Sequence, residues 1–220
     1  MDECIPGIIR DSKLFMYPFF SIAYRGKNIK EAMNFKKNVY SFSDKEYSDF
    51  YNYINSISRN RKTDLNRECI NYILENIDKN STTLVDIGCA SGYMLGLIYD
   101  KHPALKLSGF DLKKFELPDF INLTLGNIHH LPYKDKEFDS VICCHTIEHL
   151  LDLKTCITEL IRVAKKEIIV VTPCQKPFFY TLDEHVNFFY YKELLTSVFP
   201  LKKFKCIKLK GDWVYHGFIE

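Results

Sequence analysis

The chain has 220 residues, which is enough for one domain with a sizeable core. Hydrophobic residues make up 46% of it and charged residues 26%, and both values are typical of globular proteins. The formal net charge is only +2, so composition argues against a protein that coats nucleic acid and against an acidic tail.

Eight cysteines are present, and none are spaced Cys-x-x-Cys. We therefore expect reduced thiols and neither a disulfide framework nor a zinc ribbon. The apolar segment 14–24 is too short to span a bilayer and contains Pro18. The acidic residues before it are wrong for a signal peptide. We expect a cytoplasmic protein without a membrane span, of unpredicted oligomeric state.

Residues 1–62 differ from the rest of the chain. They are rich in Tyr, Phe, Asn and Lys and show no strand alternation, and residues 44–57 have apolar residues close to helical spacing. We expect short helices over the mouth of a ligand site, acting either as a lid or as a packing extension. The predicted division is an N-terminal helical segment, 1–62, and a main domain, 63–220.

From residue 63 onward, strand and helix patterns alternate. Strands are predicted at 83–87, 105–110, 121–125, 138–144 and 167–172, and a terminal hairpin at 204–209 and 213–218. Helices are predicted at 64–77 and 152–164, capped by Asp64 and Asp152, and at 92–101 and 190–199. This order predicts an α/β, Rossmann-like fold: a mostly parallel sheet with helices on both faces and a terminal antiparallel hairpin.

The first strand runs into a loop of small residues, Asp86-x-Gly88-x-Ala90-x-Gly92, and then into a helix. Such a loop can be an ordinary turn, or it can present free backbone N–H groups to a ligand. It differs from the dinucleotide fingerprint Gly-x-Gly-x-x-Gly in its every-second-residue spacing and in its acid. The acid would repel a pyrophosphate and attract an ammonium or sulfonium, which argues against an oxidoreductase.

This loop resembles the first motif, Asp/Glu-x-Gly-x-Gly-x-Gly, of the class I methyltransferases that use S-adenosylmethionine. Ala90 replaces the middle glycine, which is tolerable if its φ stays negative. Later blocks, at 126–133, 138–141, 147–149 and 159–164, also look like one broad family of small-molecule methyltransferases, the methyltransferase domain 11 or ubiquinone-biosynthesis-like group. The resemblance implies a seven-stranded fold, with S-adenosylmethionine as cofactor and S-adenosylhomocysteine as product.

Ligands of an open parallel sheet bind at the carboxyl ends of its strands. Asp111 ends the second strand, where it can accept both ribose hydroxyls or cap the next segment. Asn127 stands where the resembling family usually has an acid on the adenine amino group, and Ile128 can cover the adenine. The expected cofactor-binding residues are Asp86, Gly88, Cys89, Ala90, Gly92, Tyr93, Asp111, Leu112, Asn127, Ile128 and His145.

Three polar residues, His145, Glu148 and His149, follow the fourth strand at spacings that would place them on one helical face. His185 follows the fifth strand. His185 or His149, with Glu148, can act as a general base or orient the acceptor.

Alternatively, all four residues bind a divalent metal. The pattern is similar to that of metal-dependent methyltransferases acting on ubiquinone-precursor catechols or on RNA 3′-terminal ribose. Those carry Glu-x-x-Glu-His here, and His145 replaces their first Glu. Packed, hydrogen-bonded histidines are the remaining interpretation.

Aromatic residues near the expected lid and reacting end favour a small acceptor with a planar or apolar face, such as a sugar, a quinone precursor or a polyketide. They are Tyr40, Phe42, Tyr47, Phe178, Phe179, Tyr180, Phe188 and Phe189. O-methylation of a small molecule is the first expectation.

Methylation of RNA or tRNA is the alternative. Its support is two basic clusters, Arg59, Arg61 and Lys62, and Lys202, Lys203, Lys205, Lys208 and Lys210. Alternating lysines are equally typical of an exposed edge strand. A cofactor-binding partner subunit without catalysis is a third possibility.

Overall fold

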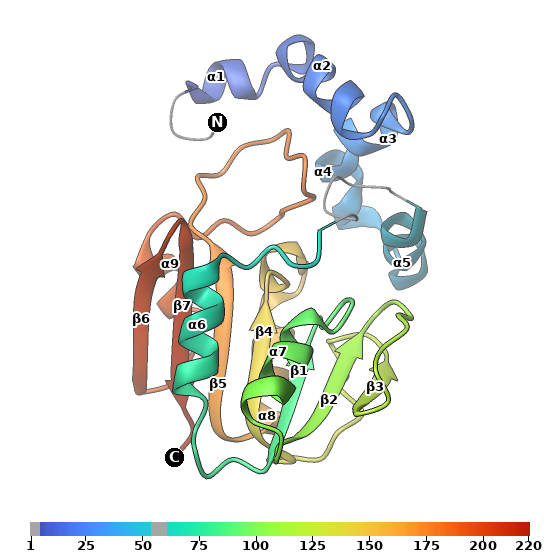
Figure 1. Ribbon diagram of the computed structural model, residues 1–220. Coiled ribbons are helices and arrows are strands. Elements are labelled where there is room, and N and C mark those ends of the chain that lie inside the picture. The colour runs from blue at the N-terminus through green and yellow to red at the C-terminus, as the bar shows by residue number, and fades with distance from the viewer. Residues whose placement is uncertain (1–4, 54–60) are drawn as a thin grey trace.

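The computed structural model describes residues 5–53 and 61–220. Over these residues, seven strands form one sheet in the order β3-β2-β1-β4-β5-β7-β6 (Figure 1). Their bounds are β1 Thr83–Ile87, β2 Lys106–Asp111, β3 Ile121–Leu125, β4 Phe138–Cys144, β5 Ala164–Pro173, β6 Lys203–Leu209 and β7 Asp212–Phe218. Strand β7 pairs antiparallel with both β5 and β6, and the other pairs are parallel. The predicted fold class is confirmed.

Helices cover both faces of the sheet (Figure 1). On one face lie α6, Arg67–Asn76, and α7, Tyr93–Lys101, and on the other lie α8, Leu153–Val163, and α9, Lys192–Thr196. Each pair buries an apolar stripe against the sheet, which gives two hydrophobic cores. This two-sided burial explains why apolar residues predominate in the central strands β1, β4 and β5.

Two helix boundaries differ from the prediction for identifiable reasons. The cap of α6 is Asn66, whose side chain accepts from the N–H of Cys69 (3.0 Å), while Asp64 pairs with Arg61. Helix α9 is shorter than 190–199, because the chain just before it is held against β7, where the carbonyl of Phe189 accepts from the Trp213 indole (2.7 Å). The predicted cap of α8 by Asp152 is confirmed.

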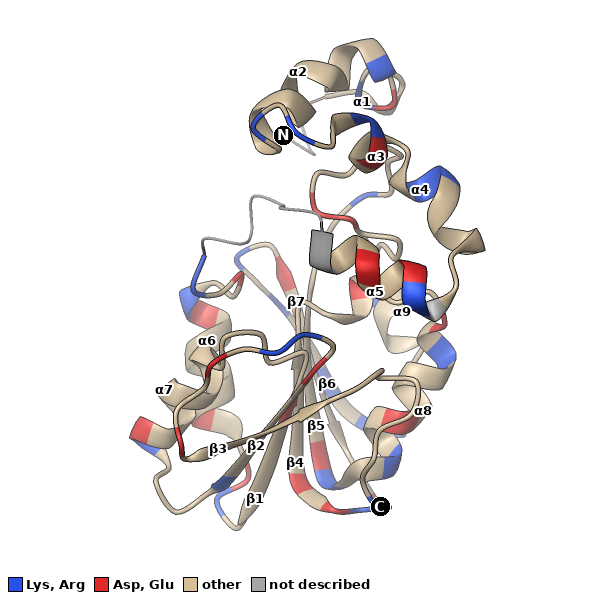
Figure 2. Cartoon of the chain, turned by 90° about the vertical axis from the view of Figure 1, so that its right-hand side faces the viewer, with Lys and Arg blue, Asp and Glu red and all other residues tan. Residues whose placement is uncertain are grey.

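In the described part of the chain, six short helices precede the sheet domain and lie beyond the carboxyl ends of the strands (Figures 1 and 2). They are α1 Gly7–Arg10, α2 Lys13–Ala23, α3 Ile29–Met33, α4 Phe35–Asn38, η1 Val39–Ser41 and α5 Asp44–Tyr53. We call them the helical cap. Buried Met16, Phe20 and Met33 give it a small core of its own. The last part of the predicted helix 44–57, and Arg59, lie outside the described residues.

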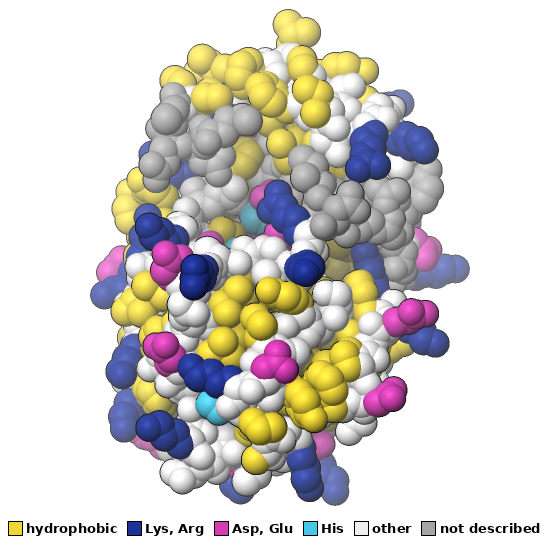
Figure 3. Space-filling model, viewed as in Figure 1, with side chains coloured by type: hydrophobic (Ala, Val, Ile, Leu, Met, Phe, Trp, Pro, Cys, Tyr) yellow, Lys and Arg dark blue, Asp and Glu magenta, His cyan; other side chains and the backbone are white. Residues whose placement is uncertain are grey.

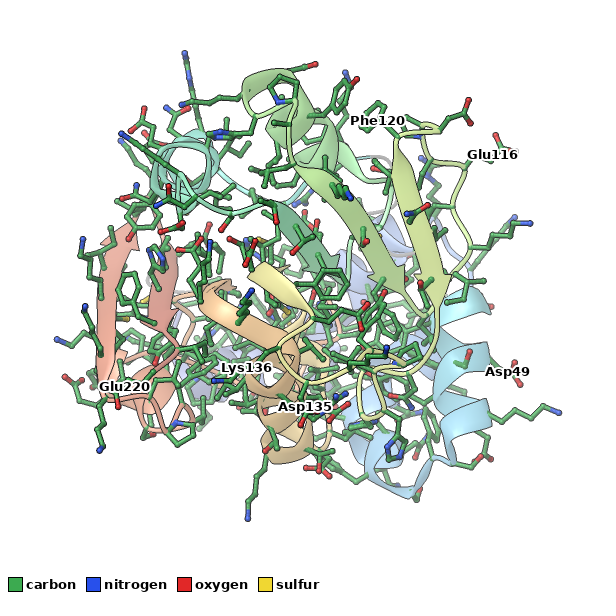
Figure 4. The ribbon with its side chains drawn as sticks, turned by 90° about the horizontal axis from the view of Figure 1, so that it is seen from below. Asp49, Glu116, Phe120, Asp135, Lys136 and Glu220 are labelled. Atoms are coloured by element: carbon green, nitrogen blue, oxygen red, sulfur yellow. The ribbon has the colours of Figure 1, made fainter. Side chains whose placement is uncertain are left out.

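The opposite end of the sheet lies far from these six helices. Viewed from there (Figure 4), Lys136 lies just before β4 and Glu220 just after β7, and the Lys136 ammonium donates to the Glu220 carbonyl (3.4 Å). Among the residues described, no helix is both long enough and apolar enough to cross a membrane. The cytoplasmic location stays a prediction.

Candidate functional site

A cavity of about 310 Å³ opens at the carboxyl ends of β1, β2, β3 and β4, where the sequence places the cofactor. The loops after these strands form most of its wall, and η1 and α5 close one side through Phe42, Tyr47 and Tyr51. The volume is within the range of small-molecule sites. The space between the sheet domain and the cap is visible as a hollow in Figure 3.

The loop after β1 has the unusual backbone that its small residues suggest. Gly88 has φ +82°, and a Cβ built on it would lie 2.2 Å from Thr146 Oγ1, so no larger residue fits. Ala90 has φ +44°, so the condition under which an alanine there would be free of strain is not met. The reason is a tertiary hydrogen bond: its N–H donates to Asp111 Oδ2 (2.9 Å), which fixes the turn.

Asp111 caps the segment after β2 and also lines the cavity. Its Oδ1 accepts from the N–H of Lys113 (2.9 Å). Burial raises its pKa, while the two backbone hydrogen bonds oppose that shift. The carboxylate is thus held rigidly at the cavity wall, where it can accept further hydrogen bonds from a ligand's hydroxyls.

Asp86 is only 3% exposed, and its Oδ1 has no hydrogen-bond partner among the described residues. Burial, together with the nearby charge of Asp111, raises its pKa to about 8. A buried carboxylate oxygen without a donor destabilises the free protein and suits a cationic ligand. This acid beside the cavity, with the tight Gly88 loop, fits S-adenosylmethionine, whose sulfonium and ammonium are both cations.

The structure brings seven of the eleven predicted cofactor residues to the cavity wall: Gly88, Ala90, Asp111, Leu112, Asn127, Ile128 and His145. The other four, Asp86, Cys89, Gly92 and Tyr93, are not among the residues that line it. The Asn127 side-chain oxygen also accepts from the N–H of His129 (3.1 Å), so part of its capacity holds the loop.

His145 does not share a helical face with Glu148 and His149, so that prediction is wrong. Its N–H donates to Val171 O (2.8 Å), which prolongs the β4–β5 pairing, and its φ of +48° then turns the chain. Only a single turn, η3 Ile147–His149, follows. The ring lies 3.3 Å from Glu148 Oε1 and 3.5 Å from Asp212 Oδ2. Burial alone would lower its pKa, but the two carboxylates raise it, so His145 is cationic at neutral pH.

Glu148 is fully buried and links two parts of the chain. Its backbone carbonyl accepts from the N–H groups of Val186 (2.8 Å) and Asn187 (2.9 Å). Its side-chain Oε2 accepts from Thr172 Oγ1 (3.2 Å). The loop after β5 is therefore pinned to η3, and this brings His185 beside His149.

The rings of His149 and His185 lie edge to face, with centroids 4.8 Å apart. The Nδ1 atom of His185 lies 2.8 Å from Gln175 Oε1, and that of His149 lies 3.4 Å from the carbonyl of Glu184. In the neutral form of each ring one nitrogen donates and the other offers a lone pair, and the Nε2 atom of His185 also lies 3.6 Å from Asp183 Oδ2. Burial lowers both pKa values to about 4, so both rings are neutral at pH 7.

Glu148, His149 and His185 each offer a ligand atom within 4.8 Å of the others. This trio lies beside the cavity, because His149 is also part of the cavity wall. His145, expected in the same cluster, lies outside the trio and contacts it through Glu148. Two neutral imidazoles and one carboxylate can accept a proton from an acceptor hydroxyl or hold a divalent cation.

The helical cap contacts the trio through His149. The hydroxyl of Tyr47 donates to the carbonyl of His149 (2.8 Å), and that of Tyr51 lies 3.3 Å from His149 Nδ1. Between the cap and the loop after β5, the hydroxyl of Tyr24 donates to Glu184 Oε1. Sequence reasoning missed Tyr51 and Glu184, although the spacing of Tyr47 and Tyr51 by four residues places both on one helical face.

The aromatic residues that the sequence analysis placed near the acceptor lie in different environments. Phe42 and Tyr47 line the cavity, whereas Tyr40 and Phe179 are exposed and Phe189 belongs to the main core. Phe178 and Phe188 pack against the ammonium of Lys36, which lies 4.0 Å from the Phe188 ring centroid. Only part of the aromatic set therefore faces the cavity.

Comparison with known proteins agrees with this arrangement. The methyltransferase-domain family model matches residues 85–172. An uncharacterized Methanocaldococcus jannaschii protein, MJ0638, is 37% identical over 141 residues, which is 61% of each chain. The tRNA U34 carboxymethyltransferase of Nautilia profundicola is 30% identical over 100 residues, 41% of this chain and 33% of that one. The demethylmenaquinone methyltransferase of Lactiplantibacillus plantarum is 36% identical over 76 residues, 34% of this chain and 32% of that one.

The chain thus spans about three fifths of the first of these relatives and about a third of the other two. Among solved structures, the protein bound to the Haloferax volcanii Trm112 methyltransferase activator aligns with a TM-score of 0.53 at 14% identity, over 67% of this chain and 87% of that one. That likeness shows the fold. The segment 85–172 that matches the family model includes nearly all of β1 and the whole of β2, β3 and β4, whose ends form the cavity. It also includes the acidic small-residue loop after β1 that the sequence analysis singled out. Residues 85–172 therefore match a methyltransferase domain, in agreement with the resemblance to the class I S-adenosylmethionine-dependent methyltransferases that the sequence shows.

Proposed function

We propose that this protein transfers a methyl group from S-adenosylmethionine to an oxygen atom of a small molecule. The observation that carries the proposal is the pair of neutral imidazoles, His149 and His185, beside the cavity. In the transfer, the acceptor oxygen attacks the methyl carbon, the carbon–sulfur bond breaks, and its electron pair stays on sulfur as S-adenosylhomocysteine forms. The acceptor's proton goes to an imidazole Nε2.

Cofactor binding is assigned to the strand-end loops. Asp111 would accept the ribose hydroxyls, and Ile128 and Leu112, both in the cavity wall, would enclose the adenine. The backbone of the Gly88–Ala90 turn and the buried carboxyl of Asp86 would face the methionine end, whose positive charge would favour the ionised form of the acid. Cationic His145 is the exception to this scheme, because it repels a sulfonium; its pairing with Glu148 and Asp212 balances that charge.

The trio of Glu148, His149 and His185 supports a second role for the same residues, that of holding a divalent metal ion. The Nδ1 atom of each histidine lies near an oxygen acceptor, as in many metal-bound histidines, while the Nε2 atom of His185 also lies 3.6 Å from Asp183 Oδ2. Glu148 would supply the carboxylate, although it also neutralises His145. A bound ion would supply a Lewis acid for the acceptor oxygen, in place of a simple base.

A small acceptor is favoured over RNA by the placement of the basic residues. Strand β6, which carries Lys203, Lys205 and Lys208, is the outer edge of the sheet and is separated from β4 by β5 and β7. Those lysines protect an edge strand rather than border the cavity. RNA nevertheless remains the alternative acceptor, with the partial similarity to a tRNA-modifying enzyme as its support. A cofactor-binding partner subunit would bind S-adenosylmethionine without turnover.

The experiment is a calorimetric titration of the purified chain with S-adenosylmethionine and S-adenosylhomocysteine, with and without Mn²⁺. We expect micromolar binding of both. Incubation with methyl-labelled cofactor and separate pools of phenols, sugars and tRNA then identifies the acceptor class. Label only in the small-molecule pools supports the proposal, and label only in tRNA supports the alternative. Binding without any transfer, in the presence of a cell extract, would favour the partner-subunit interpretation.

A further inference from the structure

The outer surface of the helical cap is strongly apolar. Ile8 is 87% exposed, Leu14 87%, Tyr17 51% and Ile22 79%. Three of them, Leu14, Tyr17 and Ile22, lie on α2 at spacings that place them on one side of the helix. Figure 3 shows hydrophobic side chains gathered at the top of the molecule, over these helices. Contiguous exposed apolar surface of this kind marks a contact with something else.

Helix α2 is apolar on both sides. Its inner face contributes Met16 and Phe20 to the small core of the cap, so the exposed face is additional. A helix that is hydrophobic all round is normally buried. With 11 residues, α2 is too short to cross a bilayer, which requires about 20. The remaining way to bury its outer face in lipid is to lie in the plane of the interface.

Charge identifies which apolar partner fits. Residues 5–40 contain seven Lys or Arg and two Asp or Glu, although the whole chain is nearly neutral. Lys13 is exposed at the start of α2, and Arg25, Lys27 and Lys30 are exposed just beyond its end, so cations flank the apolar face (Figure 2). A second copy on the same face would bring these cations together, which is unfavourable. An anionic surface would pair with them.

We propose that the α1–α2 face of the helical cap docks on the surface of an anionic lipid bilayer. The side chains of Ile8, Leu14, Tyr17 and Ile22 enter the interface, and the flanking lysines and Arg25 contact the headgroups. The cavity then lies on the far side of the cap from the lipid, and α5 connects the two. The inference is independent of the proposed methyl transfer, because it rests on the outer face of the cap alone.

Flotation of the full chain with vesicles tests this. The probes are vesicles of phosphatidylcholine with 30% phosphatidylglycerol and vesicles of phosphatidylcholine alone, at low and high salt. We expect binding to the anionic vesicles, weakened by salt and at least about tenfold weaker with the neutral ones. No binding to anionic vesicles overturns the proposal, as does equal binding to both kinds. No cofactor is needed, so this failure is distinct from failure of the proposed function.

Two pairs of variants locate the contact. Leu14→Ser with Ile22→Ser should lower vesicle affinity at least about tenfold, and Leu125→Ser with Leu194→Ser, exposed on the sheet domain, should not. Lys27→Glu with Lys30→Glu should lose the preference for anionic vesicles, and Lys203→Glu with Lys205→Glu on β6 should keep it. Equal effects of the cap and sheet variants overturn the assignment. So does a dimer in solution that Leu14→Ser with Ile22→Ser dissociates, if the wild type floats with neither vesicle. Circular dichroism checks that each variant is folded.

Discussion

His149 and His185 lie edge to face, at an interplanar angle of 74°, although they come from segments on either side of β5. The contact exists because the carbonyl of Glu148 holds the loop after β5 through two backbone N–H groups. The Nδ1 atoms of the two rings lie near the carbonyl of Glu184 and Gln175 Oε1, and burial keeps both rings neutral at pH 7. Two neutral imidazoles thus lie in contact beside the cavity, which is the feature from which their role in methyl transfer is inferred.

The first prediction concerns His185. Replacing it with Ala should lower turnover by roughly 10²–10⁴-fold, the usual contribution of a general base, and leave S-adenosylmethionine affinity nearly unchanged. Single-turnover transfer and calorimetry measure the two quantities. His130→Ala is the matched control, because His130 is exposed and lies outside the metal-ligating trio. Loss of cofactor affinity with normal turnover at saturation would remove His185 from the reacting end.

The second prediction separates the metal from the simple base. If Glu148, His149 and His185 hold an ion, chelator should abolish transfer and added Mn²⁺ or Zn²⁺ should restore it. Metal content after dialysis should fall from about one ion per chain to near none in Glu148→Gln, which keeps the shape of the side chain. His130→Ala should retain the ion. Full activity in chelator would leave the imidazoles as the only base.

Asp111 provides the third prediction. Asp111→Ala should weaken S-adenosylmethionine binding by at least about tenfold, because hydrogen bonds to a charged acceptor contribute roughly 1.5–3 kcal/mol each. Asp111→Asn keeps one acceptor oxygen for the Ala90 N–H, so its S-adenosylmethionine affinity should lie between those of the wild type and Asp111→Ala. Asp119→Ala, exposed between β2 and β3, is the control. Affinity unchanged in Asp111→Ala would mean that the ribose lies elsewhere.

The parts of the fold that follow from local pattern were predictable. Strands β1, β3 and β4 have the predicted bounds, and most residues of β1 and β4 are apolar because these central strands are buried on both faces. The acidic small-residue loop Asp86–Gly92 predicted the end of the sheet at which the cavity opens. The cap of α8 follows from Asp152, a single capping residue at the right place.

Long-range contacts account for what the sequence did not predict. The positive φ of His145 follows from its pairing with Val171, and that of Ala90 from its hydrogen bond to Asp111. Asp64 and Asn66 are both good caps, and only tertiary packing selects Asn66. The contact of Tyr24 with Glu184 joins segments that no local spacing relates.

The fourth prediction compares two glycines. Gly88 and Gly211 both have positive φ, but a Cβ on Gly88 meets Thr146 at 2.2 Å, while one on Gly211 meets no described residue within 4 Å. Gly211→Ala should therefore cost about 1 kcal/mol of unfolding free energy from backbone strain alone. Gly88→Ala should cost more and should also weaken cofactor binding. Denaturant unfolding and calorimetry measure both. Equal costs, with normal binding in Gly88→Ala, would contradict the tight turn.

The last prediction concerns Asp86 and pH. Its pKa is raised to about 8 in the fold, above the ordinary 3.8, so the folded state holds this proton more tightly than the unfolded state does. Its contribution to stability is therefore fully present below about pH 4 and is lost as pH rises toward 8, by up to about 1.4 kcal/mol per pH unit.

Asp86→Asn should remove this part of the pH slope and stabilise the free protein at pH 8, because a neutral amide replaces a buried charge that has no donor among the described residues. The same variant should bind S-adenosylmethionine more weakly, since the acid no longer faces the cation. Melting temperatures of both proteins from pH 5 to pH 8.5, without and with cofactor, measure the two effects. Identical slopes would show that Asp86 is ionised throughout, and a stabilised variant with undiminished cofactor affinity would show that the acid has no part in binding.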